Sequence, residues 1–340
     1  MSTLDGICDT VNDDLSTFAG RGAAFVTVGE TMVRDTPADD ERLERTRQKC
    51  GPQHLSTSNL GQNRGRMSHK KVLITGAYGL IGNIVYGCLA ENSEAYDVYG
   101  LARRHHPSDR VPKDQVHEIP GEKFFLVNLS DWEGMRRAVQ GMDVVVHMAA
   151  DPSGMRGWES ILNNNLIGTY HVFEACRLAG IKRVIFASSI QVSFGYRFEA
   201  FNRSISNKGV EATPAEIPQV THQQPACPLN LYAASKVWGE ALAHVYAYSH
   251  EMSFICLRIG WVTKEDRPQS HPRASAVWCS QRDIVQLVER CIGAPPSVRF
   301  DVFYGVSDNR DRFVDIEHAR EVVGYVPQDR AEDYADDERS

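Results

Sequence analysis

The sequence predicts an α/β fold, in which a doubly wound parallel sheet carries a small C-terminal substrate lobe. From Lys71 onward, short apolar runs of strand length alternate with segments of helical periodicity. A glycine-punctuated turn joins the first run to the first helix. Ser188 and Ser189 end the fifth run, and hydroxyls at the carboxyl end of a parallel strand face the ligand crevice. Together these observations predict a Rossmann-type sheet.

The first strand and its turn form the motif around which the rest is organised. Val72–Ile74 is an apolar, β-branched run, and three glycines follow it in a G-x-x-G-x-x-G spacing. Glycines let backbone N–H groups approach a pyrophosphate, and the start of the next helix adds a partial positive charge. An ordinary tight turn is the alternative, but the strand before and the helix after favour a cofactor. The residues expected at the cofactor are Gly76, Tyr78, Gly79, Leu80, Ile81 and Gly82.

The second strand, residues 96–101, bears on the choice of cofactor. It ends near Arg103, about 21 positions after Gly82. A carboxylate here would accept hydrogen bonds from the adenosine ribose and favour NAD, whereas an arginine can pair with a 2′-phosphate. Arg103 therefore favours NADP weakly, and a solvated basic loop is the alternative.

Five further strands are expected at residues 124–127, 143–147, 183–187, 254–259 and 298–304. The ends of three of them supply cofactor candidates, which are Asn128, Leu129, Met148, Ala149, Ala150 and Ile259. A single helix is expected over residues 159–179, and its interior contains Asn163, Asn164 and Asn165. Asparagine is a poor residue for a helix interior, so one of the three is expected to serve a purpose there.

Tyr232 and Lys236 are the candidate catalytic pair. Residues four apart on a helix lie on one face. A nearby ammonium favours the phenolate, so the pKa of Tyr232 is expected to fall toward a value that suits a general base. Ser189 would orient the substrate hydroxyl. The pair alone is weak evidence, but glycine loop, serine and tyrosine–lysine pair follow in the order that one active site requires.

Composition narrows the class of protein. The formal net charge of −7 argues against nucleic acid or an anionic membrane as the main partner. No apolar run approaches the ~20 residues that span a bilayer. The eight cysteines and twelve histidines form no zinc-like spacing, so we expect no metal and a reducing cytoplasm.

The chain is expected to contain one main folded region. Residues 1–68 are expected to form a flexible N-terminal extension that need not fold, with linker composition before the first strand. Residues 69–330 form the cofactor-binding domain, with the substrate lobe mostly within 193–228 and 261–330. Residues 331–340 read as an acidic, frayed tail.

These motifs resemble the extended short-chain dehydrogenase/reductase family, also called the NAD(P)-dependent epimerase/dehydratase family. The likeness covers residues 71 to about 329 and includes TGAYGLIG, HMAA, NNNLIG, FASS and YAASK. The resemblance assigns the three glycines to the pyrophosphate and Ser189, Tyr232 and Lys236 to catalysis. It assigns Asn165 to a cofactor-side or proton-relay position.

Within that family the chain is most similar to uronate dehydrogenases and archaeal NAD-dependent glucose-6-phosphate dehydrogenases. Those enzymes oxidise the anomeric hydroxyl of a sugar to a lactone, and Arg273 matches their carboxylate-binding arginine. The residues expected at a sugar or sugar-acid substrate are Ser153, Ser189, Ile190, Gln191, Trp261 and Arg273. Ile190, Gln191 and Trp261 depart from the relatives, so the resemblance does not name the sugar.

Two other functions stay open on the sequence. One is a nucleotide-sugar epimerase or dehydratase with retained NAD, although the short stretch after Lys236 favours a small substrate. The other is a non-catalytic NAD(P)-sensing regulatory protein, although Tyr232 and Lys236 are both intact. The resemblance also makes a homodimer through paired helices an open expectation.

Overall fold

The computed structural model describes residues 69–152, 157–198, 219–269 and 271–334, without the side chains of residues 272 and 273. All of them belong to one compact unit, residues 49–340. The expected N-terminal extension lies outside the described residues. Among those residues, no helix has the length and apolar character needed to cross a membrane.

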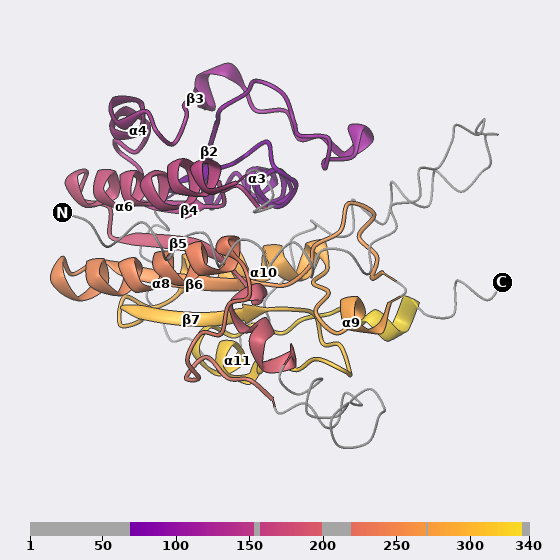
Figure 1. Cartoon of the computed structure of the whole chain (residues 1–340). Helices are drawn as coiled ribbons and strands as arrows, with labels where there is room; N and C mark the ends of the chain where they lie inside the picture. The colour runs from indigo at the N-terminus through magenta and orange to yellow at the C-terminus, as the bar shows by residue number, and fades with distance from the viewer. Residues whose placement is uncertain (1–68, 153–156, 199–218, 270, 335–340) are drawn as a thin grey trace, which may run out of the picture. The chain divides into compact units, whose positions relative to one another are not determined.

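The fold is built on a sheet of seven parallel strands in the order β3-β2-β1-β4-β5-β6-β7 (Figure 1). The strand order reverses between β1 and β4, which places a ligand crevice beyond their carboxyl ends. The Rossmann-type prediction is confirmed, and each predicted strand is present. The strands are β1 Lys70–Thr75, β2 Tyr96–Ala102, β3 Phe124–Leu126, β4 Val144–His147, β5 Arg183–Ser189, β6 Ser253–Ile259 and β7 Phe300–Gly305.

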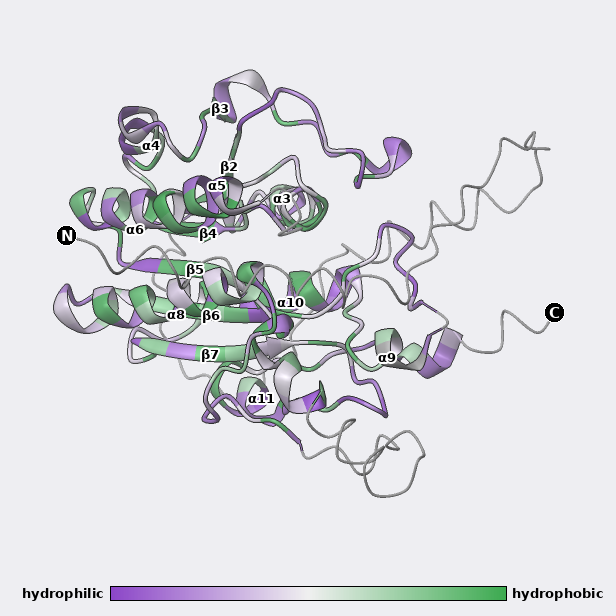
Figure 2. Cartoon of the chain, viewed as in Figure 1, coloured by the Kyte–Doolittle hydropathy of each residue, from purple (hydrophilic) through white to green (hydrophobic). Residues whose placement is uncertain are grey.

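Helices cover both faces of the sheet. The longer ones are α3 Leu80–Glu91, α6 Gly168–Leu178, α8 Leu231–Ser249 and α10 Gln281–Gly293. The shorter ones are η1 Lys113–Gln115, η2 Gly121–Lys123, α4 Trp132–Ala138, α5 Trp158–Ser160, η3 Ile161–Ile167, η4 Ile190–Ser193, α9 Pro272–Ser275, α11 Glu317–Val323 and η6 Ala331–Tyr334. Figure 2 shows the strands as mainly apolar, whereas the helices carry both apolar and polar residues.

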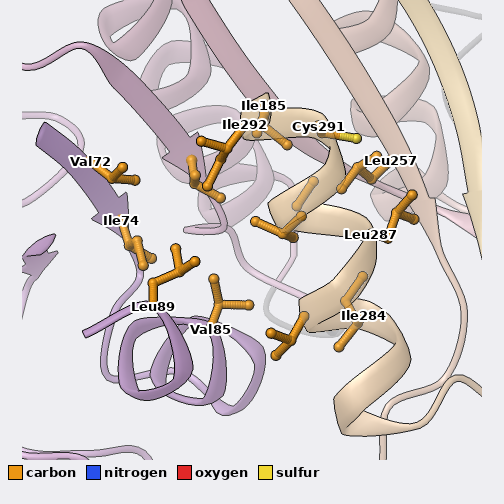
Figure 3. Close-up of a cluster of buried hydrophobic side chains, with 14 of the residues drawn as sticks. Val72, Ile74, Val85, Leu89, Ile185, Leu257, Ile284, Leu287, Cys291 and Ile292 are labelled. Carbon is orange, nitrogen blue, oxygen red and sulfur yellow. The ribbon is translucent and has the colours of Figure 1, made fainter. Parts of the chain in front are cut away.

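Alternation along the strands divides the core between the two faces. Val72 and Ile74 of β1 point to the face covered by α3 and α10, where they meet Val85 and Leu287 (Figure 3). Leu73 points to the other face and belongs to the cluster formed with α4, α6 and α8. Burying one such aliphatic side chain contributes about 1.5–3 kcal/mol. A strand buried on both faces must be apolar throughout, which is why the runs are recognisable in the sequence.

A third cluster joins the two segments expected to form the substrate lobe. Val220 packs here with residues that follow the sixth strand. Its amide donates to the Phe313 carbonyl at 2.7 Å, and its carbonyl accepts from the Asp315 amide at 3.0 Å. The full cluster is Ile190, Val220, Val277, Tyr304, Val306, Phe313, Val314 and Ile316.

Three local expectations need correction. The single helix expected over 159–179 is interrupted by a π-helical turn, η3. The acidic tail is not frayed at its start, because the Ala331 amide donates to Asn309 at 3.0 Å and the Tyr334 ring lies 5.2 Å from that of Trp278. Among the residues that the structure describes, five cysteines are free thiols, as expected, but Cys88 is disulfide-bonded. A cytoplasmic location stays a prediction.

Candidate active site

The glycine loop between β1 and α3 is shaped so that a dinucleotide fits. Gly76 has φ +72°, and a Cβ on it would lie 2.8 Å from the amide nitrogen of Ala149. A Cβ on Gly82 would overlap the carbonyl oxygen of Gly76. The backbone therefore needs glycine at both positions, and the first amides of α3 remain available for an anion.

Asn83, which the sequence reading did not single out, holds this loop in place. Its side chain is fully buried, and its amide donates to the carbonyls of Ala77 at 3.2 Å and His117 at 2.9 Å. Its carbonyl oxygen accepts from the His117 amide at 2.9 Å. Because every one of these partners is backbone, Asn83 fixes the loop between β1 and α3 against the segment before β3. Tyr78 packs its ring against Phe124, with 5.2 Å between ring centres.

Arg103 stands where the sequence placed it, directly after β2, and is exposed together with Arg104. The loop that follows returns to the glycine loop, since the Ser108 amide donates to the Tyr78 carbonyl at 2.9 Å. Arg110, two positions on, lies close enough to Tyr232 to lower the pKa of its phenol. The basic loop after β2 is therefore adjacent to both the expected cofactor and the expected catalytic group.

The π-helical turn η3 explains the asparagine run. Asn165 is 2% exposed, and its carbonyl oxygen accepts from the Asp151 amide at 2.7 Å. Its amide donates to the Asp151 carbonyl at 3.1 Å and to the Ser235 hydroxyl at 3.0 Å. Ser235 in turn donates to the carbonyl of Tyr232 at 2.7 Å. Asn165 thus ties the end of β4 to the helix that carries the tyrosine.

Ser189, Tyr232 and Lys236 come together at the carboxyl end of β5. Ser189 hydrogen-bonds the Tyr232 phenol, and the Lys236 ammonium donates to the Ala187 carbonyl at 2.7 Å. The same ammonium lies 5.7 Å from the centre of the Tyr232 ring. Asn230 caps α8 by accepting from the Ala233 amide at 2.8 Å, which fixes the start of the helix just before the tyrosine.

The pKa values of the tyrosine and the lysine differ from what the sequence led us to expect. Burial raises the pKa of Tyr232, and the Ser189 hydrogen bond and the charge of Arg110 only partly offset this effect. Burial also lowers the pKa of Lys236 to about 7, so the ammonium is held weakly. The lowered pKa expected for Tyr232 from the nearby ammonium is therefore not found in this structure. Lys236 has to stay protonated before its charge can favour the phenolate of Tyr232.

Glu240, one helical turn after Lys236, helps to keep Lys236 protonated. Its carboxylate opposes the effect of burial and raises the pKa of Lys236. It accepts from the Ser188 hydroxyl at 2.5 Å and from the Arg258 guanidinium at 3.0 and 2.8 Å. Arg258 also donates to the Tyr304 hydroxyl at 2.9 Å. This buried network lies on β5, α8, β6 and β7, and no motif in the sequence pointed to it.

His147 is a strand-end histidine with two hydrogen-bond partners. It is fully buried, with Nδ1 2.7 Å from the Thr75 hydroxyl and Nε2 3.2 Å from the Thr169 hydroxyl. Burial lowers its pKa to about 3, helped by the charge of Lys236. The ring is therefore neutral, and both its nitrogens are already used.

The other expected cofactor residues lie at the carboxyl edge of the sheet. Met148, Ala149 and Ala150 follow β4 and are half-buried. The side-chain oxygen of Asn128 accepts from the Ser130 amide at 3.2 Å, while Leu129 and Ile259 belong to the two main cores.

The expected substrate residues are placed unevenly. Ile190 is fully buried in the third cluster, which leaves its side chain no surface for a substrate, so this expectation does not fit. Gln191 accepts from the Asn230 amide at 2.9 Å. Trp261 is 37% exposed, with its ring 6.2 Å from that of Phe194. Ser153 lies outside the described residues, and the backbone of Arg273 lies in α9.

Comparison with known proteins agrees with this geometry. Residues 72–275 match the NAD dependent epimerase/dehydratase family. The chain is 32% identical to an NAD-dependent glucose-6-phosphate dehydrogenase of Haloferax volcanii, over 77% of this chain and 95% of that protein. It is 31% identical to a uronate dehydrogenase of Pseudomonas putida, over 78% of this chain and 86% of that protein.

A solved structure extends the likeness to the fold. A uronate dehydrogenase variant from Agrobacterium tumefaciens, complexed with NAD, superposes with a TM-score of 0.62 at 28% identity. The match covers 79% of this chain and 89% of that one. The family match spans the glycine loop, the π-helical turn and the Tyr232–Lys236 pair. The chain belongs to the NAD-dependent epimerase/dehydratase family.

Proposed function

We propose that this protein is an NAD(P)-dependent dehydrogenase that oxidises a hydroxyl of a sugar or sugar acid, at the anomeric carbon, to give a lactone. One observation carries the proposal. A continuous set of contacts runs from Gly76 against Ala149, through Asp151 and Asn165, to the helix of Tyr232. Relatives described as acting on glucose 6-phosphate, L-arabinose and uronates support the substrate class.

In this mechanism the chain's own residues manage the proton. Ser189 orients the substrate hydroxyl, and Tyr232 takes the proton from it as general base. Lys236, held positive by Glu240, stabilises the phenolate. Gly76, Gly79 and Gly82 would hold the dinucleotide, which when bound supplies the ring that accepts the hydride. Arg273 is the proposed contact for a carboxylate on the substrate, because a guanidinium binds a carboxylate through two hydrogen bonds.

The function is tested with a panel of aldoses, uronates and sugar phosphates, each with NAD and with NADP, by following the reduced nicotinamide. We expect turnover with at least one small sugar. In Tyr232→Phe we expect kcat to fall by roughly 10²–10⁴-fold while dinucleotide binding is kept, because only the general base is lost. Tyr96→Phe, at the amino end of β2 and so away from the carboxyl edge of the sheet, is the matched control.

Two results would overturn this function. Conversion of a nucleotide sugar with NAD that stays bound through purification would favour an epimerase. Binding of a dinucleotide with no turnover of any sugar, together with an unchanged cellular phenotype in Tyr232→Phe, would favour a sensor.

We also propose that Arg103 gives a weak preference for NADP. Its exposed guanidinium directly after β2 supports pairing with a 2′-phosphate. Arg103→Asp should weaken NADP use by roughly tenfold or more, since charge-assisted hydrogen bonds contribute ~1.5–3 kcal/mol. The measurement is kcat/KM for each cofactor. Unchanged NADP use, or an equal loss in the neighbouring Arg104→Asp, would remove the role from Arg103.

Finally, we propose a homodimer through the outer surfaces of α6 and α8. Four large apolar or aromatic side chains lie there about half exposed, namely Tyr170 and Leu178 on α6, and Val245 and Tyr248 on α8. Exposed patches of this kind favour association with a partner. Val245→Glu should halve the mass measured by light scattering, whereas Val326→Glu, an equally exposed valine after α11, should not. A wild-type mass of one chain would contradict the dimer.

A further inference from the structure

A second group of polar side chains lies away from the active site, at the edge of the sheet. His222 comes from the segment before α8, Asp301 from the edge strand β7, and His318 from α11. One ligand atom from each lies within 4.8 Å of the other two. The three residues are far apart in the sequence, so no spacing rule could have detected them.

Two of these groups are bonded to each other, and the third has a ring nitrogen without a partner. His318 Nε2 lies 2.6 Å from an Asp301 carboxylate oxygen. His222 Nδ1 is buried and has no hydrogen-bond partner. A buried ring nitrogen without a partner is costly, and a metal ion at this position would remove that cost.

We propose that His222, Asp301 and His318 form a binding site for one divalent transition-metal ion, and that Zn²⁺ is the best match. Two imidazoles and a carboxylate are a common donor set for zinc, with water as the fourth ligand. Neutral imidazole is the form that binds metal. In the site His318 carries its proton on Nδ1, so that Nε2 binds the ion at the position of the hydrogen bond to Asp301.

Binding needs one local movement. The rings of His222 and His318 are stacked, with 3.7 Å between centres and 13° between planes, so their nitrogens do not yet face a common point. Tetrahedral ligands at ~2.1 Å from zinc lie about 3.4 Å apart. The three ligand atoms already lie within 4.8 Å of one another, and turning the His222 ring to bring them to this separation breaks no hydrogen bond at Nδ1.

The site would fix the segment that leads into the catalytic helix. His222 lies beside Val220, which pairs with the strand-like segment at Phe313, and eight positions before the cap residue Asn230. The role is therefore structural: the ion holds the wall of the substrate lobe to β7 and α11. No catalytic group is a ligand.

The test uses the untagged full chain, freed of metal by dialysis against a chelator. Zinc content is measured after equilibration with ZnCl₂, and Co²⁺ is added separately as a spectroscopic probe. We expect one tight Zn²⁺ per chain, visible absorption typical of tetrahedral Co²⁺ with nitrogen and oxygen ligands, and a higher Tm in zinc.

His222→Gln and Asp301→Asn should each weaken zinc affinity at least tenfold and abolish the zinc-dependent rise in Tm, with little change in Tm without metal. His250→Ala, which removes an exposed histidine at the end of α8, should keep both properties. The proposal is overturned if wild type binds no zinc, or if His222→Gln and Asp301→Asn bind zinc as tightly as wild type does. All of these readouts are independent of turnover, so a failed dehydrogenase assay leaves this test intact.

Discussion

Lys236 shows how one buried charge can depend on a single neighbour. Full burial takes its pKa down to about 7, and the Glu240 carboxylate is the largest influence in the opposite direction. Glu240 is itself only 8% exposed and is compensated by the two-pronged contact with Arg258. Such a pair contributes little net stability, because desolvation offsets the attraction. Its value is to keep a positive charge beside Tyr232.

Glu240→Gln should therefore change the pH dependence of catalysis. Without the carboxylate, the ammonium of Lys236 is lost at a lower pH, so the falling limb of the kcat/KM profile moves to lower pH. We expect roughly tenfold lower kcat/KM near pH 8 and a smaller loss near pH 6, since one pKa unit is a factor of ten. Profiles over this pH range measure the effect.

Two further variants separate this role from a structural one. Ser188→Ala removes a hydrogen bond to Glu240 but keeps the charge, so its profile should keep the wild-type shape. Breaking a buried pair from one side can cost ~3–5 kcal/mol, so Glu240→Gln is also examined together with Arg258→Gln. A uniform loss of activity at all pH values would show that Glu240 only supports the fold.

At the scale of elements, the sequence predicted the strands better than the helices. Each strand is a short apolar run whose side chains face helices on both sides, and that burial can be read directly from composition. The start of α4 follows a local rule, because Asp131 is a preferred N-cap residue and its carboxylate accepts from the Gly134 amide at 2.9 Å. The short helices α9 and α11 were not predicted, since tertiary contacts rather than periodicity hold them.

The π-helical turn marks the limit of local reasoning. Three consecutive asparagines indicated that the helix interior was unusual. They did not indicate that the backbone hydrogen bonds change there from the α-helical to the π-helical pattern. The reason becomes visible only when Asp151 and Ser235, from distant parts of the chain, are seen to bind Asn165. The same holds for the site. Tyr232, Lys236 and the glycines follow recognisable spacings, whereas Glu240, Asn83 and Arg110 act through contacts between elements.

At the scale of the whole molecule, two fully buried groups, His147 and Asp283, have opposite effects on the stability of the fold in acid. The folded pKa of His147 is about 3 against 6.5 in an unfolded chain, so the unfolded state binds the extra proton and stability falls as pH drops below 6.5. The folded pKa of Asp283 is about 6 against 3.8, so the folded state binds the extra proton and stability rises as pH drops below 6. At 1.36 kcal/mol per unit, the first effect is about 5 kcal/mol and the second about 3 kcal/mol.

The full histidine effect is reached only below pH 3, but from pH 6.5 to 4 it already amounts to about 3 kcal/mol against about 2 kcal/mol for Asp283. We therefore expect these two groups together to destabilise the protein slightly over this range. His147→Gln keeps an amide that can bond both threonines, and its free energy of unfolding should fall less steeply over this range than that of wild type. The free energy of unfolding of Asp283→Asn should fall more steeply than that of wild type, because the carboxyl group that stabilises the fold in acid is gone. Urea unfolding at several pH values measures both slopes, with His250→Gln as an exposed control. Curves for His147→Gln that run parallel to wild type would mean that the buried ring takes up a proton without unfolding, and that acid sensitivity arises elsewhere in the chain.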